Sequence, residues 1–234
     1  MTSTLSIDIG GTGLKASVLD DAGQFLVPPV RVETPHPLDP PKLIDALTLL
    51  TRPLPRWDRV AVGFPGVIRR GVIRTAANLG TEAFQGFDLE AALSEALAAP
   101  VRVANDAEVQ GLAAIHGKGV ELVITLGTGF GSALFSDGSP CAHLELGHHE
   151  FRKGRTYEDA LGDAALDDAG KKKWRRRVDR AIAQLRVLTD FDHLYIGGGN
   201  ARHLEEDSLP PDVSTVDNRD GILGGIRLWQ TDPH

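Results

Sequence analysis

The alternation of apolar and polar positions predicts mostly short strands, beginning with a closely spaced pair near the N-terminus. Apolar runs at Leu5 to Ile9 and Leu14 to Leu19 flank a glycine-rich segment, which is typical of two strands joined by a tight turn. The same arrangement returns half a chain later, where Glu121 to Leu126 and Ser132 to Phe135 flank a second glycine-rich segment. The pattern therefore predicts two related halves, each opening with a strand, a turn and a strand.

Apolar residues at helical spacing predict two longer amphipathic helices. One carries Leu43, Ile44, Leu47 and Leu50 on a single face, and the other runs from about Lys171 to Leu188. The other predicted elements are strands near Phe25 to Val32, at Arg59 to Phe64, at Val101 to Ala104 and at His193 to Ile196, a hairpin over Val67 to Arg74, and helices from Asp88 to just before Pro100, from Ala107 to His116 and from Asp220 to Gln230. This order favours an α/β fold in two halves.

Both glycine-rich turns have the composition of a phosphate-binding loop. The first is Asp8-Ile9-Gly10-Gly11-Thr12-Gly13-Leu14-Lys15 and the second is Thr125-Leu126-Gly127-Thr128-Gly129-Phe130-Gly131-Ser132. Glycines let backbone N–H groups approach an oxyanion closely, and a threonine adds a hydroxyl donor. The first turn lacks P-loop spacing, and a strand follows it instead of a helix. An ordinary glycine-rich hairpin is the alternative for one turn alone, whereas two such turns could hold several phosphates of one ligand.

Composition and charge limit the classes of protein that fit these motifs. The 234 residues are 41% hydrophobic and carry 25 basic and 32 acidic side chains, a formal charge of −7. This balance argues against general binding to nucleic acids or anionic membranes, so any site for a polyanion must be local. Cys141 is the single cysteine, which excludes a disulfide framework and indicates a reducing compartment. Without a signal-like or membrane-length apolar stretch, we expect a cytoplasmic protein.

One carboxylate stands where a catalytic base is expected. Asp106 follows the short apolar strand Val101 to Ala104 and precedes a helix, and such strand ends hold reacting groups in open α/β sheets. A carboxylate that accepts a proton from an alcohol is the base that phosphoryl transfer to a hydroxyl requires. The neighbouring Asn105 can both donate to and accept from a hydroxyl. The alternative is a helix N-cap, for which Asp and Asn are favoured residues.

A second polar cluster lies in the segment Cys141-Ala142-His143-Leu144-Glu145-Leu146-Gly147-His148-His149-Glu150. Its spacing is not HExxH and no further cysteine assists, so zinc is the weaker interpretation. Glu145 and His148 offer an acceptor pair and a donor-acceptor that could grip adjacent sugar hydroxyls. A solvated loop is the alternative.

Together these segments resemble the bacterial sugar kinases of the ROK family within the actin-like ATPase superfamily, and most closely its polyphosphate glucokinase branch. The resemblance rests on seven motifs in the family's order: Asp8-Ile9-Gly10-Gly11-Thr12 with Lys15, Gly63-Phe64-Pro65-Gly66, Ala77-Asn78-Leu79-Gly80, Asn105-Asp106-Ala107, Leu126-Gly127-Thr128-Gly129, Glu145-Leu146-Gly147-His148 and Ile196-Gly197-Gly198-Gly199-Asn200. It implies two α/β domains of the actin-like ATPase (ribonuclease H-like) fold around a central cleft. These are residues 1–106 and 107–234, with the final helix packing back on the N-terminal domain.

The resemblance also implies roles for individual residues. Asp106 corresponds to the base that takes the proton from the sugar 6-hydroxyl, and Asp8 to the carboxylate that positions Mg²⁺. The implied sugar-binding residues are Asn78, Asn105, Asp106, Glu145, His148 and Glu158. The implied phosphate-binding residues are Gly10, Gly11, Thr12, Lys15, Gly127, Thr128 and Gly129, and the nucleotide is bordered by Gly198, Gly199 and Asn200. The implied reaction transfers a phosphoryl group from polyphosphate or ATP to glucose or a related hexose.

The chain departs from the family pattern in two places. The cysteine cluster that binds structural zinc in many members is replaced by Phe151-Arg152-Lys153-Gly154-Arg155-Thr156, so zinc is not expected. The region between His148 and Gly197 is shorter than the family's, which could weaken adenine packing. It contains Lys171-Lys172-Lys173-Trp174-Arg175-Arg176-Arg177, six bases in seven residues. Polyphosphate would be a natural partner for this run, an anionic partner surface is a further possibility, and the solvated face of an amphipathic helix is the plain alternative.

Two other classes of function fit parts of the same pattern. Some relatives are DNA-binding repressors, but these carry a helix-turn-helix before the first glycine-rich hairpin, and here Asp8 lies seven residues from Met1. A sensor that binds sugar without phosphorylating it is the other alternative, and the presence of Asp106 argues against it. We further expect a homodimer, the commonest symmetric assembly, and neither nucleic acid nor membrane as a partner.

Overall fold

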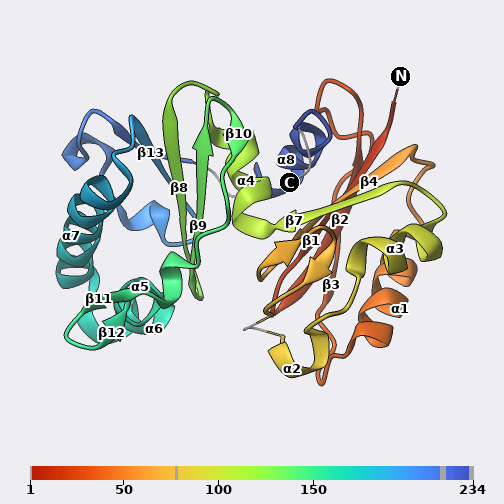
Figure 1. Ribbon diagram of the computed structural model, residues 1–234, viewed down its shortest axis with the longest axis horizontal. Coiled ribbons are helices and arrows are strands. Elements are labelled where there is room, and N and C mark those ends of the chain that lie inside the picture. Colours follow the sequence, from red (N-terminus) through yellow and green to blue (C-terminus); the bar gives the residue numbers. More distant parts are fainter. Residues whose placement is uncertain (1, 77–78, 217–219, 232–234) are drawn as a thin grey trace. The chain divides into compact units, whose positions relative to one another are not determined.

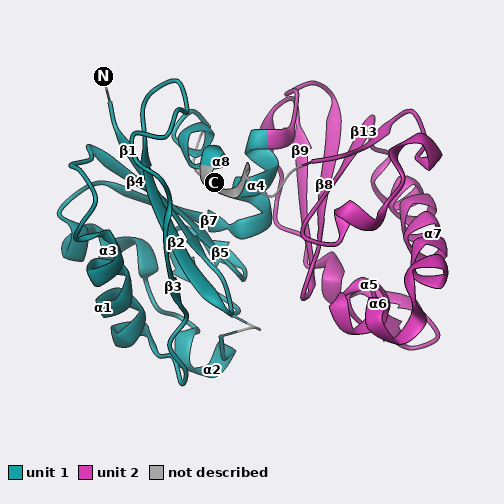
Figure 2. Ribbon diagram, turned by 180° about the vertical axis from the view of Figure 1, so that it is seen from behind, with its two compact units in different colours: residues 1–113, 221–234 teal, residues 114–220 magenta. Residues whose placement is uncertain are grey.

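Two five-stranded sheets organise the chain (Figure 1). The computed structural model describes residues 2–76, 79–216 and 220–231. Residues 1–113 and 221–234 form the first compact unit, and residues 114–220 form the second (Figure 2). The sequence predicted a boundary after Asp106, whereas the contacts within the chain place the helix that follows Asp106 in the first unit.

The sheet of the first unit has the strand order β3-β2-β1-β4-β7. Strands β1, β2 and β3 are antiparallel neighbours, and β4 and β7 extend the sheet in parallel with β1. The bounds are Thr4–Ile9 for β1, Gly13–Leu19 for β2, Val30–Glu33 for β3, Arg59–Phe64 for β4 and Val101–Asn105 for β7. A small hairpin follows β4, with β5 at Ile68–Arg69 and β6 at Val72–Ile73.

Helices cover both faces of this sheet. On one face α1 (Pro40–Thr51) and α3 (Leu89–Leu97) contribute their leucines to a core with the alternate residues of β1 and β4. On the other face lie α4 (Asp106–Ala114) and α8 (Asp220–Leu228). Gly225 of α8 packs closely against Ser6 of β1 and Ala61 of β4, where a larger side chain would collide. The short helix α2 spans Thr81–Phe84. The last helix therefore belongs to the first unit although it ends the described chain.

The sheet of the second unit repeats the same plan with the order β10-β9-β8-β13-β14. Strands β8, β9 and β10 are antiparallel neighbours, and β13 and β14 run parallel to β8. The strands are Val120–Leu126 (β8), Phe130–Ser136 (β9), Ser139–Pro140 (β10), His193–Gly197 (β13) and Val213–Thr215 (β14). The other elements are the hairpin strands β11 (Glu150–Arg152) and β12 (Arg155–Thr156), the helices α5 (Tyr157–Leu161), α6 (Asp163–Ala169) and α7 (Lys171–Thr189), and the short 3-10 helices at Leu146–His148, Ala201–His203 and Glu206–Ser208.

The predicted α/β class and the strand–turn–strand opening of each half are confirmed. The strand expected at Phe25 to Val32 is shorter and begins at Val30, because Pro28 and Pro29 have no N–H to donate to a sheet ladder. The elements that the sequence did not predict, including α5, α6 and β11–β12, are each seven residues or shorter, which is too short to show a period. Within the described residues, no helix is long and apolar enough to cross a bilayer.

The long basic helix α7 is anchored by one apolar face. Trp174, Val178 and Leu185 are fully buried, and the indole Nε1 of Trp174 donates to the carbonyl oxygen of Leu161 at 2.9 Å. Each large apolar side chain buried in this way contributes about 1.5–3 kcal/mol relative to exposure. The amphipathic helix predicted for this segment is therefore confirmed.

A buried carboxylate organises the entry to β8. Glu121 is 1% exposed, and its oxygens accept from the backbone N–H groups of His116, Gly117 and Lys118 at 2.7–3.1 Å. The Tyr195 hydroxyl donates to it at 2.8 Å. Burial opposes ionisation, but these donors outweigh it and hold the pKa of Glu121 below its ordinary value. Burial and the neighbouring carboxylate raise the pKa of Tyr195 to about 12.

Replacing Glu121 by Gln is expected to lower the free energy of unfolding by about 1–3 kcal/mol near neutral pH, because the new amide N–H₂ faces backbone N–H donors. The folded-state pKa of Glu121 is depressed below 4.5, so the advantage of Glu over Gln is complete above that pH. It is lost as the pH falls through the folded-state value. Urea unfolding of both proteins across the acidic range measures the difference.

The matched control is Glu95→Gln on the exposed surface of α3, which should change the free energy of unfolding by no more than about 0.5 kcal/mol. Equal unfolding midpoints for wild type and Glu121→Gln at neutral pH would contradict the structural role of the Glu121 carboxylate.

Candidate active site

The carboxyl ends of three neighbouring parallel strands carry the polar residues of the first unit. The sheet register pairs Asp8 of β1 with Gly63 of β4, and Phe64 of β4 with Asn105 of β7. Asp106 follows as the first residue of α4. In open α/β sheets this edge is where ligands bind. The sequence predicted Asp8, Asn105 and Asp106 as functional residues, and the sheet brings their backbones to the same edge.

The first glycine-rich turn is held by its own backbone and by the segment after β3. The N–H of Gly10 donates to the Gly13 carbonyl oxygen at 2.9 Å. Thr34 Oγ1 donates to the carbonyl oxygen of Gly10 at 2.6 Å, and His36 Nε2 lies 3.0 Å from that of Gly11. These contacts leave the carbonyl oxygens facing protein donors, which suits a turn that presents N–H groups to an anion.

Two cations border this turn. Lys15 Nζ lies 3.2 Å from Asp8 Oδ2, and both side chains are partly exposed. Arg31 of β3 is the cross-strand neighbour of Lys15, and its guanidinium lies over Gly13. The sequence predicted Lys15 but not Arg31, because the pairing of β2 with β3 is what brings Arg31 to the turn.

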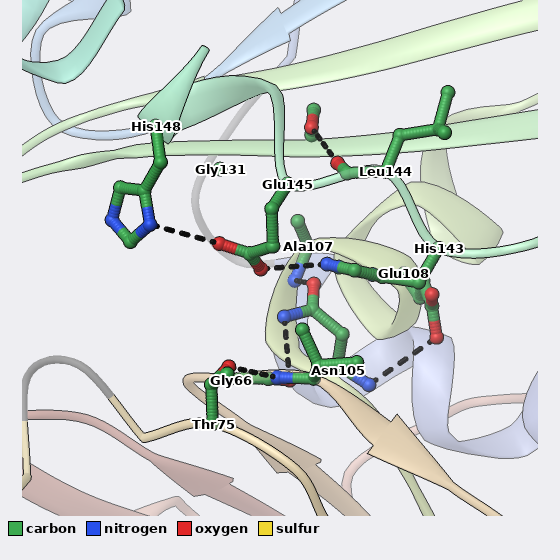
Figure 3. Close-up of polar contacts among 12 residues, drawn as sticks. Gly66, Thr75, Asn105, Ala107, Glu108, Gly131, His143, Leu144, Glu145 and His148 are labelled. Atoms are coloured by element: carbon green, nitrogen blue, oxygen red, sulfur yellow. Dashed lines mark hydrogen bonds and ion pairs between the residues drawn. The ribbon is translucent and has the colours of Figure 1, made fainter. Parts of the chain in front are cut away.

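The Asn105 side chain is locked at the start of α4 (Figure 3). It is 6% exposed, its Nδ2 donates to the Gly66 carbonyl oxygen at 3.1 Å, and its Oδ1 accepts from the N–H of Ala107 at 2.9 Å. Among the described residues these bonds use one amide hydrogen and one lone pair, which leaves a second of each for a ligand. Asp106 Oδ1 also accepts from the Ala107 N–H, at 2.8 Å. Asp106 therefore lies in the first turn of α4 and is not its N-cap; the side chain that precedes the helix and accepts from its backbone is that of Asn105.

In the second unit, the glycine-rich turn joins β8 to β9 and is supported from α5 and α6. The N–H of Gly127 donates to the carbonyl oxygen of Gly129 at 3.1 Å, and the N–H of Asp163 donates to the carbonyl oxygen of Gly127 at 2.8 Å. Glu158 Oε2 accepts from the Phe130 N–H at 3.3 Å. Glu158, predicted as a sugar ligand, thus lies against the second glycine-rich turn, and its contact with a sugar stays a prediction.

The end of β13 lies beside the end of β8. Gly198 has a φ of +87°, and a Cβ there would collide with the backbone of Leu126, so only glycine fits without strain. Asn200 is 4% exposed, its N–H donates to the carbonyl oxygen of Leu126, and its Nδ2 donates to Asp163 Oδ1 at 2.7 Å. These bonds give Asn200 a structural role between the two strand ends. The nucleotide contacts of Gly198, Gly199 and Asn200 stay predictions.

Glu145 and His148 are presented by one turn of 3-10 helix (Figure 3). Leu146 is buried and Gly147 packs closely on the backbone of Phe130, so the residues on either side project outward. The Glu145 carboxylate lies 2.7 Å from His143 Nε2 and 3.7 Å from His148 Nδ1. The hydrogen bond from His143, aided by the charge of both rings, lowers the pKa of Glu145 against the effect of burial.

This arrangement makes Glu145 an ionised hydrogen-bond acceptor at neutral pH, which is the form that binds sugar hydroxyls. His143 was not predicted as a site residue, and the alternation of His143 and Glu145 in the sequence was the signal that could have found it. Asn78, the remaining predicted sugar ligand, lies outside the described residues. Within the described chain, no three His, Cys, Asp or Glu side chains gather as a metal site.

Comparison with known proteins shows that the chain is similar to sugar kinases. A family model described as the ROK family matches residues 4–158. A polyphosphate glucokinase of Mycobacterium tuberculosis is 29% identical over 93% of this chain and 88% of its own length.

Solved structures match over nearly the whole chain. An inorganic polyphosphate/ATP-glucomannokinase from Arthrobacter sp. strain KM is 31% identical, with a TM-score of 0.85 over 98% of this chain and 99% of its own. A ROK family glucokinase from Streptomyces griseus, solved with glucose and AMPPNP, is 18% identical with a TM-score of 0.78 over 97% of this chain and 98% of its own, which is a likeness of fold.

Substitution of Gly127 and of Gly198 in the second unit is expected to have opposite effects on stability and on ligand binding. At Gly127 a Cβ would meet no atom within 4 Å, so Gly127→Ala is expected to change the free energy of unfolding by less than about 1 kcal/mol. If the turn binds phosphate as the sequence predicts, Gly127→Ala should nevertheless weaken ATP binding, because the added methyl group would obstruct the approach of a phosphate to the backbone N–H groups. Gly198→Ala, with a backbone collision at positive φ, should cost about 2 kcal/mol or more of folding free energy.

Urea unfolding and calorimetric titration with ATP measure both effects. If Gly127→Ala binds ATP as tightly as wild type, the turn has no role in phosphate binding.

Proposed function

The chain belongs to the ROK family, and from that premise we propose that it is a sugar kinase that transfers a phosphoryl group from polyphosphate or ATP to the 6-hydroxyl of glucose. One observation carries the proposal: Asp106 and the buried amide of Asn105 stand together at the carboxyl end of β7. They do so in a chain that matches a polyphosphate glucokinase and a polyphosphate/ATP-glucomannokinase over nearly its whole length.

The predicted fold of two actin-like ATPase (ribonuclease H-like) domains is confirmed. In both units, three antiparallel strands are extended by two parallel strands, and the strand order is the same. The two solved kinase structures match 97–98% of this chain and so cover both units. The reaction proposed below uses residues that these sheets place at their strand ends.

Asp106 acts as the general base in this proposal. Its carboxylate accepts the proton of the sugar 6-hydroxyl while the hydroxyl oxygen bonds to the terminal phosphorus of the donor. The bond from that phosphorus to its bridging oxygen breaks. The products are hexose 6-phosphate and either ADP or a polyphosphate shortened by one phosphate. General-base catalysis of this kind contributes about 10²–10⁴-fold to the rate.

The roles in binding the sugar are assigned to side chains of both units. Asn105 offers its remaining amide hydrogen and lone pair, and Glu145 offers an ionised carboxylate held by His143. His148 adds a ring nitrogen, and Asn78 and Glu158 complete the proposed set. Asn105 and Glu145 are each held by hydrogen bonds within their own unit, so these two side chains need little reordering of their own when a sugar binds.

The donor phosphates are assigned to the two glycine-rich turns, with Thr12, Lys15 and Thr128 as side-chain donors or charges. Gly10, Gly11, Gly127 and Gly129 are the proposed backbone positions of the two turns, and the space beside Gly127 is open, since a Cβ there would meet no atom within 4 Å. A single partly exposed carboxylate beside a phosphate turn also fits Mg²⁺, which proteins commonly hold by one or two carboxylates and the substrate phosphates. Asp8 is that carboxylate. The bound ion would offset the charge that develops on the phosphate oxygens.

A hexose other than glucose is the second candidate for the acceptor, because the relative that is 31% identical is a glucomannokinase. A sugar-binding sensor without kinase activity is the alternative of another class. It predicts glucose binding with no product from either donor.

Asp106→Asn is expected to lower kcat for glucose by at least about 10²-fold, because the amide cannot accept the proton. The KM for glucose should change by only a few fold, since the Asn side chain keeps an oxygen that can accept from the Ala107 N–H as Asp106 does. Glucose 6-phosphate formation with ATP and with polyphosphate measures kcat, and glucose binding is followed by calorimetry. A variant that retains more than about a tenth of the wild-type kcat would rule out Asp106 as the base.

The donor is tested with wild-type protein, glucose and Mg²⁺, supplied with either ATP or polyphosphate. We expect product from polyphosphate, in line with the two relatives that are named for it. Product from ATP alone would restrict the proposal to an ATP-dependent kinase. Glucose binding without product from either donor would support the sensor.

A further inference from the structure

A cavity of about 410 Å³ in the second unit is lined almost entirely by positive charge. It lies between the β11–β12 hairpin, α5 and α7, which Figure 1 shows as neighbours. Seven of its nine lining residues are Lys or Arg and none is acidic. This concentration is unusual in a chain whose formal charge is −7.

Helix α7 supplies four of the seven bases. Lys173, Arg176, Arg177 and Arg180 line the cavity, and their spacing of three, four and seven residues places them on one helical face. The apolar face of α7 is turned into the core. The run of bases seen in the sequence is thus divided between the cavity and other sides of the helix. Arg175, for example, does not line the cavity and forms an ion pair with Glu205.

The hairpin supplies the other three bases, Arg152, Lys153 and Arg155. Lys153 has a φ of +53° at the hairpin turn, where it is followed by Gly154. The hairpin occupies the segment in which the family's zinc-binding cysteines would stand. In this chain that segment contributes charge to the cavity.

Within the described chain, no ion pair joins any of the seven bases to a carboxylate. Arg155 has an acidic neighbour in Asp159, whose pKa is lowered by hydrogen bonds from Thr156 and, to a smaller extent, by the charge of Arg155. The ion pairs of this unit join Glu145 with two histidines, Arg175 with Glu205, and Arg186 with Asp212. Like charges four residues apart on a helix destabilise it, and Lys173–Arg177 and Arg176–Arg180 are such pairs. A bound polyanion would relieve this repulsion.

We propose that this cavity, the basic cavity, binds the polyphosphate chain away from its reacting end. The inference rests on the proposed kinase function for the identity of the donor. Polyphosphate is a linear polymer with negative charge along its length and no bases. The cavity offers a matching surface, with cations from two elements and a single aromatic residue, Phe151, which is only 6% exposed. Single-stranded nucleic acid would need exposed aromatic side chains for stacking.

Helix α5 links the basic cavity to the phosphate turn. Glu158 of α5 accepts from the Phe130 N–H at the end of the turn. Two residues later, Ala160 lines the cavity and its carbonyl oxygen accepts from Arg177 Nη1 at 3.1 Å. A polymer whose terminal phosphate lies at the turn can therefore continue past this five-residue helix to the basic cavity.

The consequence is a preference for long donors. Each additional phosphate that reaches the cavity binds at a high effective concentration, because the reacting end is already held. The KM for polyphosphate should therefore fall with chain length until the cavity is filled, and this dependence should weaken as salt concentration rises.

The test compares two double variants on the same helix. Arg176→Gln/Arg180→Gln removes two charges from the cavity, and Lys171→Gln/Lys172→Gln removes two exposed charges of the same run that do not line it. We expect the first pair to raise the Kd for long polyphosphate about tenfold, and the control pair to change it by less than about twofold. Binding of labelled long polyphosphate by fluorescence anisotropy gives the Kd without turnover.

As a donor, tripolyphosphate must place its terminal phosphate at the turn in order to react, so its KM should differ much less between the cavity variant and the control than the Kd of long polyphosphate does. Equal losses of long-polyphosphate affinity in both double variants would overturn the proposal, since charge alone would then explain binding. Equally tight binding of single-stranded RNA that is lost in the cavity variant would overturn it in favour of a nucleic-acid site.

The assay separates this inference from the proposed function. If wild-type protein forms no glucose 6-phosphate from any donor, the kinase proposal fails, and the comparison of the two double variants still tests the basic cavity. If wild type uses polyphosphate as a donor, the same variants should show the tenfold difference in KM for long chains, about tenfold being the loss expected for two partly exposed charges. An equal KM in both would overturn the basic cavity alone.

Discussion

Parallel pairing of strands is the constraint on which each unit depends. In the first unit β1, β4 and β7 run in the same direction, so the residues that follow their last apolar positions meet at one edge. Asp8, Asn105 and Asp106 are separated by almost half the chain, yet they belong to that edge. The second unit repeats the device with β8 and β13, and places a glycine-rich turn beside Gly198. In both units the glycine-rich turns and several of the candidate site residues stand at strand ends, which a buried sheet holds in position.

Backbone contacts keep these strand ends rigid. The second turn is tied to the N–H of Asp163 and to the carboxylate of Glu158, and Gly147 is packed on the backbone of β9. Within the second unit, such contacts fix the Glu145–His148 segment relative to the second glycine-rich turn. Rigid support of this kind lowers the ordering that a ligand must impose when it binds.

The charged side chains of the second unit fall into three groups, which differ in their burial and in the partners they contact. The Glu121 carboxylate is buried but satisfied by backbone N–H donors, so it stabilises the fold. The Glu145 carboxylate is held ionised by His143 and remains partly exposed, so it can accept from a ligand. No ion pair in the described chain joins the seven bases of the basic cavity to a carboxylate, and this distinguishes them from Arg175 and Arg186, whose charges are paired within the unit.

The sequence by itself determined the class of fold and most of its elements. The spacing of apolar residues located β4, α1 and α7, and residue type located the Asp88 cap of α3 and both glycine-rich turns. These signals are local in the sequence, so they can be recognised without the fold. It could not locate α5 or the β11–β12 hairpin, which are too short to show a period. Tertiary structure alone decided that Arg31 borders the first turn, that Glu158 contacts the second, and that Arg152 and Arg180 share one cavity. Those neighbours are far apart in the chain, and only strand pairing and helix packing bring them together.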